Sequence, residues 1–156
     1  MKNIELLFEA IRIKDNEQLK SLLKEQPDLA NVRDSRGFTP LIFATYFDNE
    51  VATKILIEHN ADIDAKDHTG NTALIGVSFK GNEKLAKLLI EKGANINAQN
   101  NLGTTPLIFA TTYNQQNTVA LLLDHKADKT IQDKEGRKAI NYASEKGYQD
   151  LVALLQ

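Results

Sequence analysis

The sequence contains no cysteine and no tryptophan, and it has only three histidines in 156 residues. Without cysteine the chain cannot form a disulfide framework, a thiolate metal site or a cysteine nucleophile. No apolar run approaches the roughly 18 residues that a membrane-spanning helix needs. The first ten residues resemble a signal peptide, but Glu5 and Glu9 interrupt the apolar stretch and favour an amphipathic helix. We therefore expect a cytoplasmic protein that does not enter a membrane.

The chain also lacks an excess of charge of one sign. Its formal net charge is −2, and its acidic and basic residues are interspersed. This balance predicts no attraction to nucleic acid or to an anionic membrane. Lys134, Arg137 and Lys138 make one segment near the C-terminus basic, but Glu135 and Glu145 interrupt it. We interpret that segment as a solvated surface and not as a nucleic-acid-binding patch.

One pattern recurs every 33 residues, in which an acidic or amide residue is followed by a glycine and then by a short polar-to-apolar run. Its four copies are residues 34–41, 67–74, 100–107 and 133–140. A period of this length is typical of a stacked repeat array. Such arrays present long surfaces and seldom form catalytic pockets.

The residues around one copy predict two short helices and a turn. Thr39 can cap the first helix through its hydroxyl group, and residues 48–49 tolerate the left-handed conformation that ends it. A second helix is expected over about 50–59, and Asn60 stands where a helix often ends in a left-handed residue. The polar segment 61–66 is too short for a third helix and should extend into a tight turn.

The copies Gly-Phe-Thr-Pro-Leu-Ile-Phe-Ala at 37–44 and Gly-Thr-Thr-Pro-Leu-Ile-Phe-Ala at 103–110 strongly resemble the core motif of the ankyrin repeat family. The segment Leu-Leu-Ile-Glu-Lys-Gly-Ala-Asn at 88–95 resembles the ending of that family's second helix. The resemblance implies an all-α fold, an ankyrin repeat solenoid of stacked helix-turn-helix units with projecting β-turn fingers.

By this resemblance, residues 1–156 should form a single ankyrin repeat domain. The N-terminal cap repeat would cover 3–33, with helices near 4–13 and 17–24 and one extra residue near 27–31. The internal repeats would be 34–66, 67–99 and 100–132, and the C-terminal cap repeat would be 133–156.

Three departures from the family's pattern matter. Its usual histidine is replaced at every copy, so apolar packing should take over from a hydrogen bond between repeats; the replacements are Ile42, Ile75, Ile108 and Asn141. Thr72–Ala73 and Lys138–Ala139 replace Thr-Pro, which should weaken two helix starts. Lys126 occupies the left-handed position held elsewhere by Asn60 and Gly93, which predicts strain there.

Catalytic and metal-binding motifs are missing. His59 and His125 should be exposed residues at helix ends two repeats apart, about 20 Å from each other, which is too far to share a metal. The acidic run 62–67 resembles a calcium loop but has neither the loop glycine nor the bidentate glutamate. We expect no enzyme activity and no cofactor, because an enzyme would need a convergent polar site that these residues do not assemble.

Ankyrin arrays bind partners through the turn tips and the exposed ends of the first helices, which line a concave groove. Carried onto this chain, the partner-binding residues would be Arg36, Phe38, Tyr46, Phe47, His68, Asn71, Phe79, Lys80, Asn101, Leu102 and Tyr113. Five of these are aromatic, and aromatic residues at such positions favour an interaction surface. We expect the five rings to form one groove patch. Phe79 could alternatively cover a seam between repeats, and Phe43 and Phe109 are expected in the core.

Together these features predict a non-catalytic, monomeric protein-interaction module that binds a protein or peptide partner in its concave groove. The partner itself has no signature in the sequence. The alternative is a self-associating structural scaffold that uses the same aromatic patch between copies of the chain.

Overall fold

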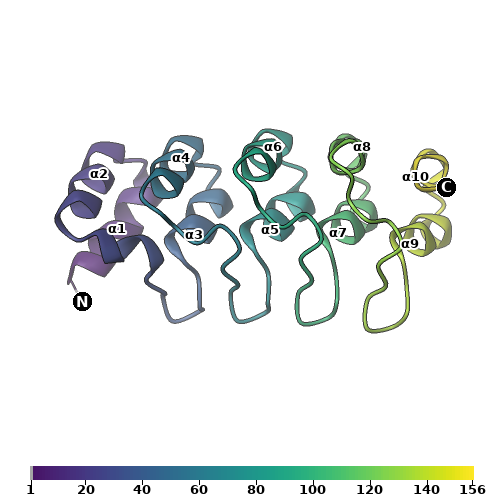
Figure 1. The fold of residues 1–156 in the computed structure, drawn as a ribbon, viewed down its shortest axis with the longest axis horizontal. Coiled ribbons are helices and arrows are strands. Elements are labelled where there is room, and N and C mark those ends of the chain that lie inside the picture. Colours follow the sequence, from purple (N-terminus) through teal and green to yellow (C-terminus); the bar gives the residue numbers. More distant parts are fainter. Residues whose placement is uncertain (1) are drawn as a thin grey trace.

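The computed structural model describes residues 2–156 and shows a row of antiparallel helix pairs with the two chain ends at opposite ends of the row (Figure 1). The elements are α1 (Lys2–Ile13), α2 (Asn16–Glu25), the 3₁₀ helix η1 (Pro27–Asn31), α3 (Pro40–Tyr46), α4 (Glu50–Glu58), α5 (Ala73–Lys80), α6 (Glu83–Glu91), α7 (Pro106–Thr112), α8 (Gln116–Asp124), α9 (Ala139–Lys146) and α10 (Gln149–Leu155). Residues 2–156 contain no β-strand, so the all-α solenoid is confirmed.

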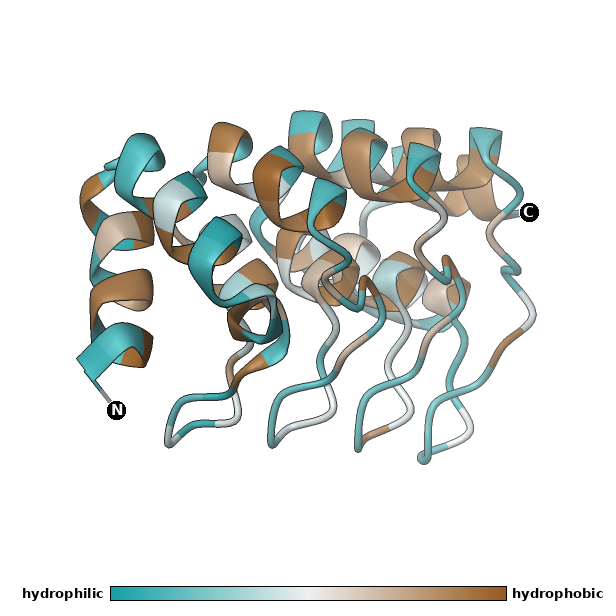
Figure 2. Ribbon diagram, turned by 60° about the vertical axis from the view of Figure 1, so that its left-hand side comes forward, coloured by the Kyte–Doolittle hydropathy of each residue, from teal (hydrophilic) through white to brown (hydrophobic). Residues whose placement is uncertain are grey.

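The first helices of the pairs pack against one another in one row, and the second helices form another row, which lies above the first in Figure 1. The loops that join one pair to the next project together on one side (Figure 1). We call the part of each loop that runs from the recurring acidic or amide residue to the next helix a finger, at 34–39, 67–72, 100–105 and 133–138. Hydrophobic residues concentrate on the helices, whereas the fingers are mostly hydrophilic (Figure 2). The 3₁₀ helix η1 occupies residues 27–31, the segment near which an extra residue was expected.

Threonine side chains start three of the first helices. The hydroxyl oxygens of Thr39, Thr72 and Thr105 each accept a hydrogen bond from the backbone N–H three residues later. Helix α5 therefore keeps its cap although alanine replaces proline at residue 73. Helix α9 has no hydroxyl cap; instead, the backbone N–H of Lys138 donates a hydrogen bond to Asn141 Oδ1 at 2.8 Å.

Left-handed residues end the helices where the sequence predicted them. Asn60 has φ 66°, Lys126 has φ 65° and Gly93 has φ 95°. In the turn between α3 and α4, Asp48 also adopts a positive φ of 53°. Asn, Asp and Gly tolerate this conformation, whereas at Lys126 we expect strain, because the Cβ atom lies close to the following carbonyl oxygen.

The core is an apolar strip that runs along the array. Ile42, Ile75 and Ile108, which replace the family's histidine, are buried, so the predicted apolar packing is confirmed at these positions. Ile90 and Ile96 contact buried residues on both sides and join the two halves of the strip.

Hydrogen bonds with the same 33-residue offset tie neighbouring repeats at the base of the fingers. Arg33 Nη1 donates to the carbonyl oxygen of Lys66 at 2.5 Å, Lys66 Nζ donates to that of Gln99 at 2.8 Å, and Gln99 Nε2 donates to that of Gln132 at 3.2 Å. We call this series the finger-base ladder. It fixes the distance between successive fingers through side chains that are not part of the core.

Two predictions on single side chains were wrong. His59 is half-buried and not exposed, because its ring turns back onto its own helix with Nδ1 2.8 Å from the carbonyl oxygen of Ile55. Phe109 is half-buried and not in the core, since its ring packs against exposed rings and faces an open pocket.

Among residues 2–156, no helix is long and apolar enough to cross a membrane.

Candidate functional site

Each finger is shaped by the acidic or amide residue that begins it. In Asp67, Oδ1 accepts hydrogen bonds from the backbone N–H groups of Thr69 and Asn71 at 2.9 and 3.0 Å. The same pair of bonds, two and four residues ahead, is made by Asp34, Asn100 and Asp133. This turn needs a positive φ at its glycine, which is 82° at Gly70.

The fingers lie side by side and bond to each other. The backbone N–H of Asn101 donates to the carbonyl oxygen of Thr69 at 3.0 Å, and its side-chain Nδ2 donates to that of His68 at 2.9 Å. The side chain of Asn101 is therefore already used within the array. Leu102, at the tip of the same finger, is 71% exposed and is the most accessible large apolar residue of the described chain.

A first group of aromatic rings lies between the first finger and α3. Tyr46 is 55% exposed, and its ring centroid lies 6.2 Å from that of Phe38 and 5.1 Å from that of Phe47. Phe38 and Phe47 are half-buried and pack against the core. The Arg36 guanidinium lies 4.4 Å from the Phe38 ring centroid and pairs with Asp34 at 2.7 Å.

A second group of rings lies at the ends of α5 and α7. Phe79 is 40% exposed and Tyr113 is 49% exposed, and their ring centroids are 4.4 Å apart. Phe109 packs beneath both, with its centroid 5.4 Å from that of Phe79. Tyr113, the residue after α7, therefore joins Phe79 of α5 in one exposed aromatic surface that spans two neighbouring repeats.

An apolar pocket of about 280 Å³ separates the two groups, at the junction of fingers and first helices. We call it the Gly76 pocket, because Gly76 of α5 forms its floor. Its other walls include Phe38, Tyr46, Asp67, Phe79, Lys80 and Phe109. At the positions 33 residues before and after Gly76 the chain has phenylalanine, so the pocket lies where the neighbouring repeats carry an aromatic side chain.

A family model described as ankyrin repeats (3 copies) matches residues 7–100 and 75–156. This chain belongs to the ankyrin repeat family. Ankyrin repeats are generally protein–protein interaction modules, and the family is typically non-catalytic. A comparison with curated proteins found no match.

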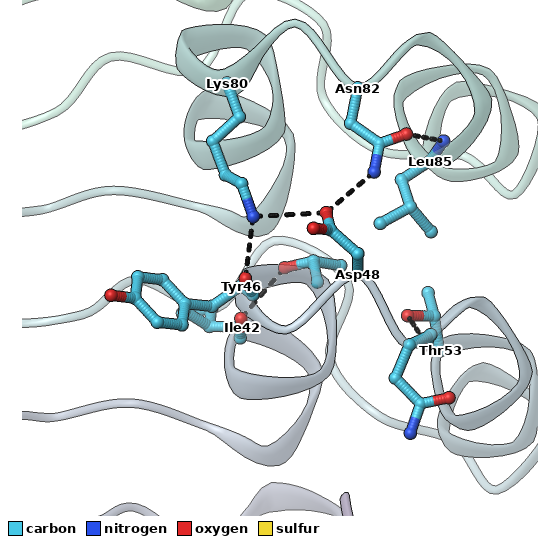
Figure 3. A network of polar contacts seen from close by, with 9 residues as sticks. Ile42, Tyr46, Asp48, Thr53, Lys80, Asn82 and Leu85 are labelled. Atoms are coloured by element: carbon cyan, nitrogen blue, oxygen red, sulfur yellow. Dashed lines mark hydrogen bonds and ion pairs between the residues drawn. The ribbon is translucent and has the colours of Figure 1, made fainter. Parts of the chain in front are cut away.

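Lys80 is exposed, and a polar network holds its side chain against the surface of the ankyrin array (Figure 3). Its Nζ donates to the carbonyl oxygen of Tyr46 at 2.7 Å and to Asp48 Oδ1 at 3.1 Å, and Asn82 Nδ2 donates to the same carboxylate oxygen at 2.9 Å (Figure 3). Burial of Asp48 favours its neutral form, but the hydrogen bonds from Asn82 and Lys80 outweigh burial and lower the pKa of the carboxyl. The network fixes α5 against the end of α3 and so fixes the width of the pocket.

The predicted partner-binding residues fall into three locations on this ankyrin array. Those that line the Gly76 pocket are Phe38, Tyr46, Asn71, Phe79 and Lys80. Phe47 and Tyr113 contact these pocket residues from outside, and Arg36 covers Phe38. His68, Asn101 and Leu102 lie on the fingers. The five rings expected to form one groove patch lie in two groups on either side of this pocket, and that they bind a partner stays a prediction.

Sequence reasoning missed three residues of this site: Gly76, Asp67 and Phe109. The signal was present in the period, because residues 43, 76, 109 and 142 are Phe, Gly, Phe and Tyr. A glycine in a series of aromatic residues predicts an unfilled space between the helices.

Within residues 2–156, no group of three or more acidic or histidine side chains is placed to hold a metal ion.

Proposed function

We propose that this ankyrin array binds a protein or peptide partner, without catalysis, in the groove between its fingers and its first helices. The observation that carries the proposal is a set of three large exposed rings: Tyr46 and Phe79 line an apolar pocket, and Tyr113 packs against Phe79 beside it. Exposed apolar surface of this kind marks interaction sites, and tyrosine is enriched among the residues that dominate binding energy.

The rigidity of the groove supports binding without a large entropic cost. The finger-base ladder holds successive fingers apart, and the bonds from Lys80 hold α3 against α5. A preformed surface does not have to be ordered when a partner binds, which leaves more of the contact energy as affinity. Exposed tip residues such as Leu102 and His68 would then distinguish between partners.

We further propose that residues 1–156 act as one ankyrin domain, with cap repeats at 3–33 and 133–156 around the internal repeats. In support, Asn141 of α9 is exposed at the position where the internal repeats bury Ile42, Ile75 and Ile108. The monomeric state and the cytoplasmic location stay predictions.

Selection from a library of displayed random peptides tests the groove. Peptides enriched on the wild-type protein are labelled, and their affinities are measured by fluorescence polarisation. The Tyr46→Ala/Tyr113→Ala variant should bind them at least tenfold more weakly, because it loses two exposed rings. The matched control is Val51→Ala/Leu154→Ala, which removes exposed apolar side chains from the second helices and should bind normally.

If both variants bind the peptides equally well, the proposal that the groove is the binding site is contradicted. Light scattering after gel filtration, with the same proteins, tests the alternative of self-association. A wild-type dimer that becomes a monomer in Tyr46→Ala/Tyr113→Ala would show that the rings join two copies of the chain, and it would overturn the monomeric prediction.

A further inference from the structure

The last repeat shows what fills the position of Gly76 when a side chain is present. Tyr142 of α9 lies 66 residues after Gly76, at the same place in the period. Its hydroxyl group donates a hydrogen bond to Oδ2 of Asp133, the residue that begins the finger of that repeat. One phenol group thus packs along the first helix and bonds to the finger carboxylate.

Asp67 is the counterpart of Asp133 in the repeat that contains Gly76. Its Oδ1 accepts the same two backbone hydrogen bonds, and also one from Thr69 Oγ1 at 2.7 Å. Its Oδ2 has no hydrogen-bond or ion-pair partner within residues 2–156, although Asp67 lines the Gly76 pocket. In the two other fingers that begin with aspartate, Oδ2 is occupied, by Arg36 for Asp34 and by Tyr142 for Asp133.

We propose that the Gly76 pocket binds the side chain of a tyrosine from the partner polypeptide, with the ring over Gly76 and the hydroxyl group donating a hydrogen bond to Asp67 Oδ2. The inference rests on the proposed function and specifies it. The incoming tyrosine would take the place of Tyr142 in the last repeat, with the partner supplying the side chain that this repeat lacks.

The walls of the pocket suit an aromatic ring. Four of its lining residues, Phe38, Tyr46, Phe79 and Phe109, are aromatic, so an inserted ring would meet other rings. A Cβ atom placed on Gly76 would meet no atom within 4 Å, which shows that the space directly above the floor is open. Lys80 at the rim already bonds to Tyr46 and Asp48, so it leaves the ring contacts undisturbed.

The unpaired Oδ2 of Asp67 determines which aromatic side chain the pocket binds most tightly. A phenol group can donate a hydrogen bond to Asp67, whereas phenylalanine cannot, and a bond to a charged acceptor is among the stronger ones. A phosphotyrosine would bring its negative charge towards the same carboxylate and be repelled. The pocket should therefore prefer unmodified tyrosine to both.

The experiment uses three small probes: N-acetyl-tyrosinamide, N-acetyl-phenylalaninamide and N-acetyl-phosphotyrosinamide. Each is titrated into ¹⁵N-labelled protein, and the amide signals are followed by NMR. The tyrosine probe should shift the signals of Gly76, Asp67 and Phe109 and saturate at about tenfold lower concentration than the phenylalanine probe. The phosphotyrosine probe should bind most weakly.

Two variants copy side chains that other repeats already carry. Gly76→Phe introduces the residue found at Phe43 and Phe109, and it should abolish the shifts from every probe by filling the pocket. Asp67→Asn introduces the residue found at Asn100, which forms the same turn, and it should remove most of the preference for tyrosine while leaving ring binding intact. Both should keep the wild-type circular dichroism spectrum.

Binding of the tyrosine probe to Gly76→Phe with wild-type affinity would overturn the inference, as would tighter binding of the phosphotyrosine probe. Shifts of Gly76 that grow with protein concentration alone would assign the pocket to a second copy of the chain and also overturn it. Displayed peptides that bind the groove of Gly76→Phe unchanged would leave the proposed function intact and remove only the tyrosine pocket. Binding of the tyrosine probe by a protein that binds no displayed peptide would contradict the proposed function, while the pocket would still bind the tyrosine side chain.

Discussion

The hydroxyl group of Tyr142 donates a hydrogen bond to the carboxylate of Asp133, joining the first helix of the last repeat to its finger. Burial, and then this hydrogen bond, raise the pKa of Tyr142 to about 12. Burial alone would raise the pKa of Asp133, but hydrogen bonds from Tyr142 and from two backbone N–H groups outweigh it and lower that pKa. The pair therefore favours a protonated phenol beside an ionised carboxylate.

This pair predicts an alkaline loss of stability. The folded-state pKa of Tyr142 lies above the value of 10.0 for an ordinary tyrosine, so the folded protein holds this proton more tightly than the unfolded chain. Its contribution should be complete below pH 10 and should fall as the pH rises towards 12. Urea unfolding at pH 8 and pH 11 should show a smaller alkaline decrease for Tyr142→Phe than for wild type. Tyr148→Phe, which removes a hydroxyl without a hydrogen bond among residues 2–156, is the control.

Replacing Lys126 with glycine should raise the melting temperature. Lys126 has φ 65°, a conformation that costs a side chain about 1 kcal/mol and costs glycine little. For a chain of this length the gain corresponds to a rise of about 2–4 °C. Lys92→Gly, at a residue with φ −90°, should give no increase in the same calorimetric scan. An unchanged or lower melting temperature for Lys126→Gly would reject the strain.

The floor of the pocket should tolerate one extra methyl group. Gly76 lies inside α5, where alanine is favoured over glycine by about 1 kcal/mol, and a Cβ there meets nothing within 4 Å. Gly76→Ala should therefore increase the free energy of unfolding in urea. The contrasting substitution is Gly103→Ala, which would place a Cβ 2.8 Å from the backbone nitrogen of Lys134 and should destabilise the protein. A destabilised Gly76→Ala would mean that the space is filled.

A buried threonine in α8 offers another test. Thr118 is 1% exposed, and its hydroxyl has no hydrogen-bond partner among residues 2–156, while the same position holds Leu85 and Leu151 in neighbouring repeats. Thr118→Val should stabilise the protein by about 1 kcal/mol, because an unpaired buried hydroxyl is lost at little change in shape. In Thr53→Val the hydroxyl lost donates to Asn49 at 2.8 Å, so that variant should not gain stability. Equal changes in the two chemical denaturation curves would argue against this account.

The period predicted the array well because each repeat contacts only its neighbours. Local features such as the Thr39 cap and the left-handed Asn60 therefore sufficed to place helices and turns. The partner site was harder to predict, since it depends on relations between repeats. The sequence shows that residue 76 is glycine, but only the structure shows that the side chains of Tyr46 and Phe109 leave its space open. The unpaired oxygen of Asp67 likewise follows from the absence of a partner, which no pattern of residues displays.

The finger-base ladder has a consequence for how such a chain can change in length. Each of its bonds reaches the same acceptor one repeat ahead, so deletion of 67–99 would bring the side chain of Lys66 to the carbonyl oxygen of Gln132 and close the junction again. Whole repeats can thus be duplicated or lost by recombination, because the hydrogen bond between the newly adjacent repeats can form again. The Gly76 pocket does not share this freedom, because its walls come from three successive units and it exists only in their present order.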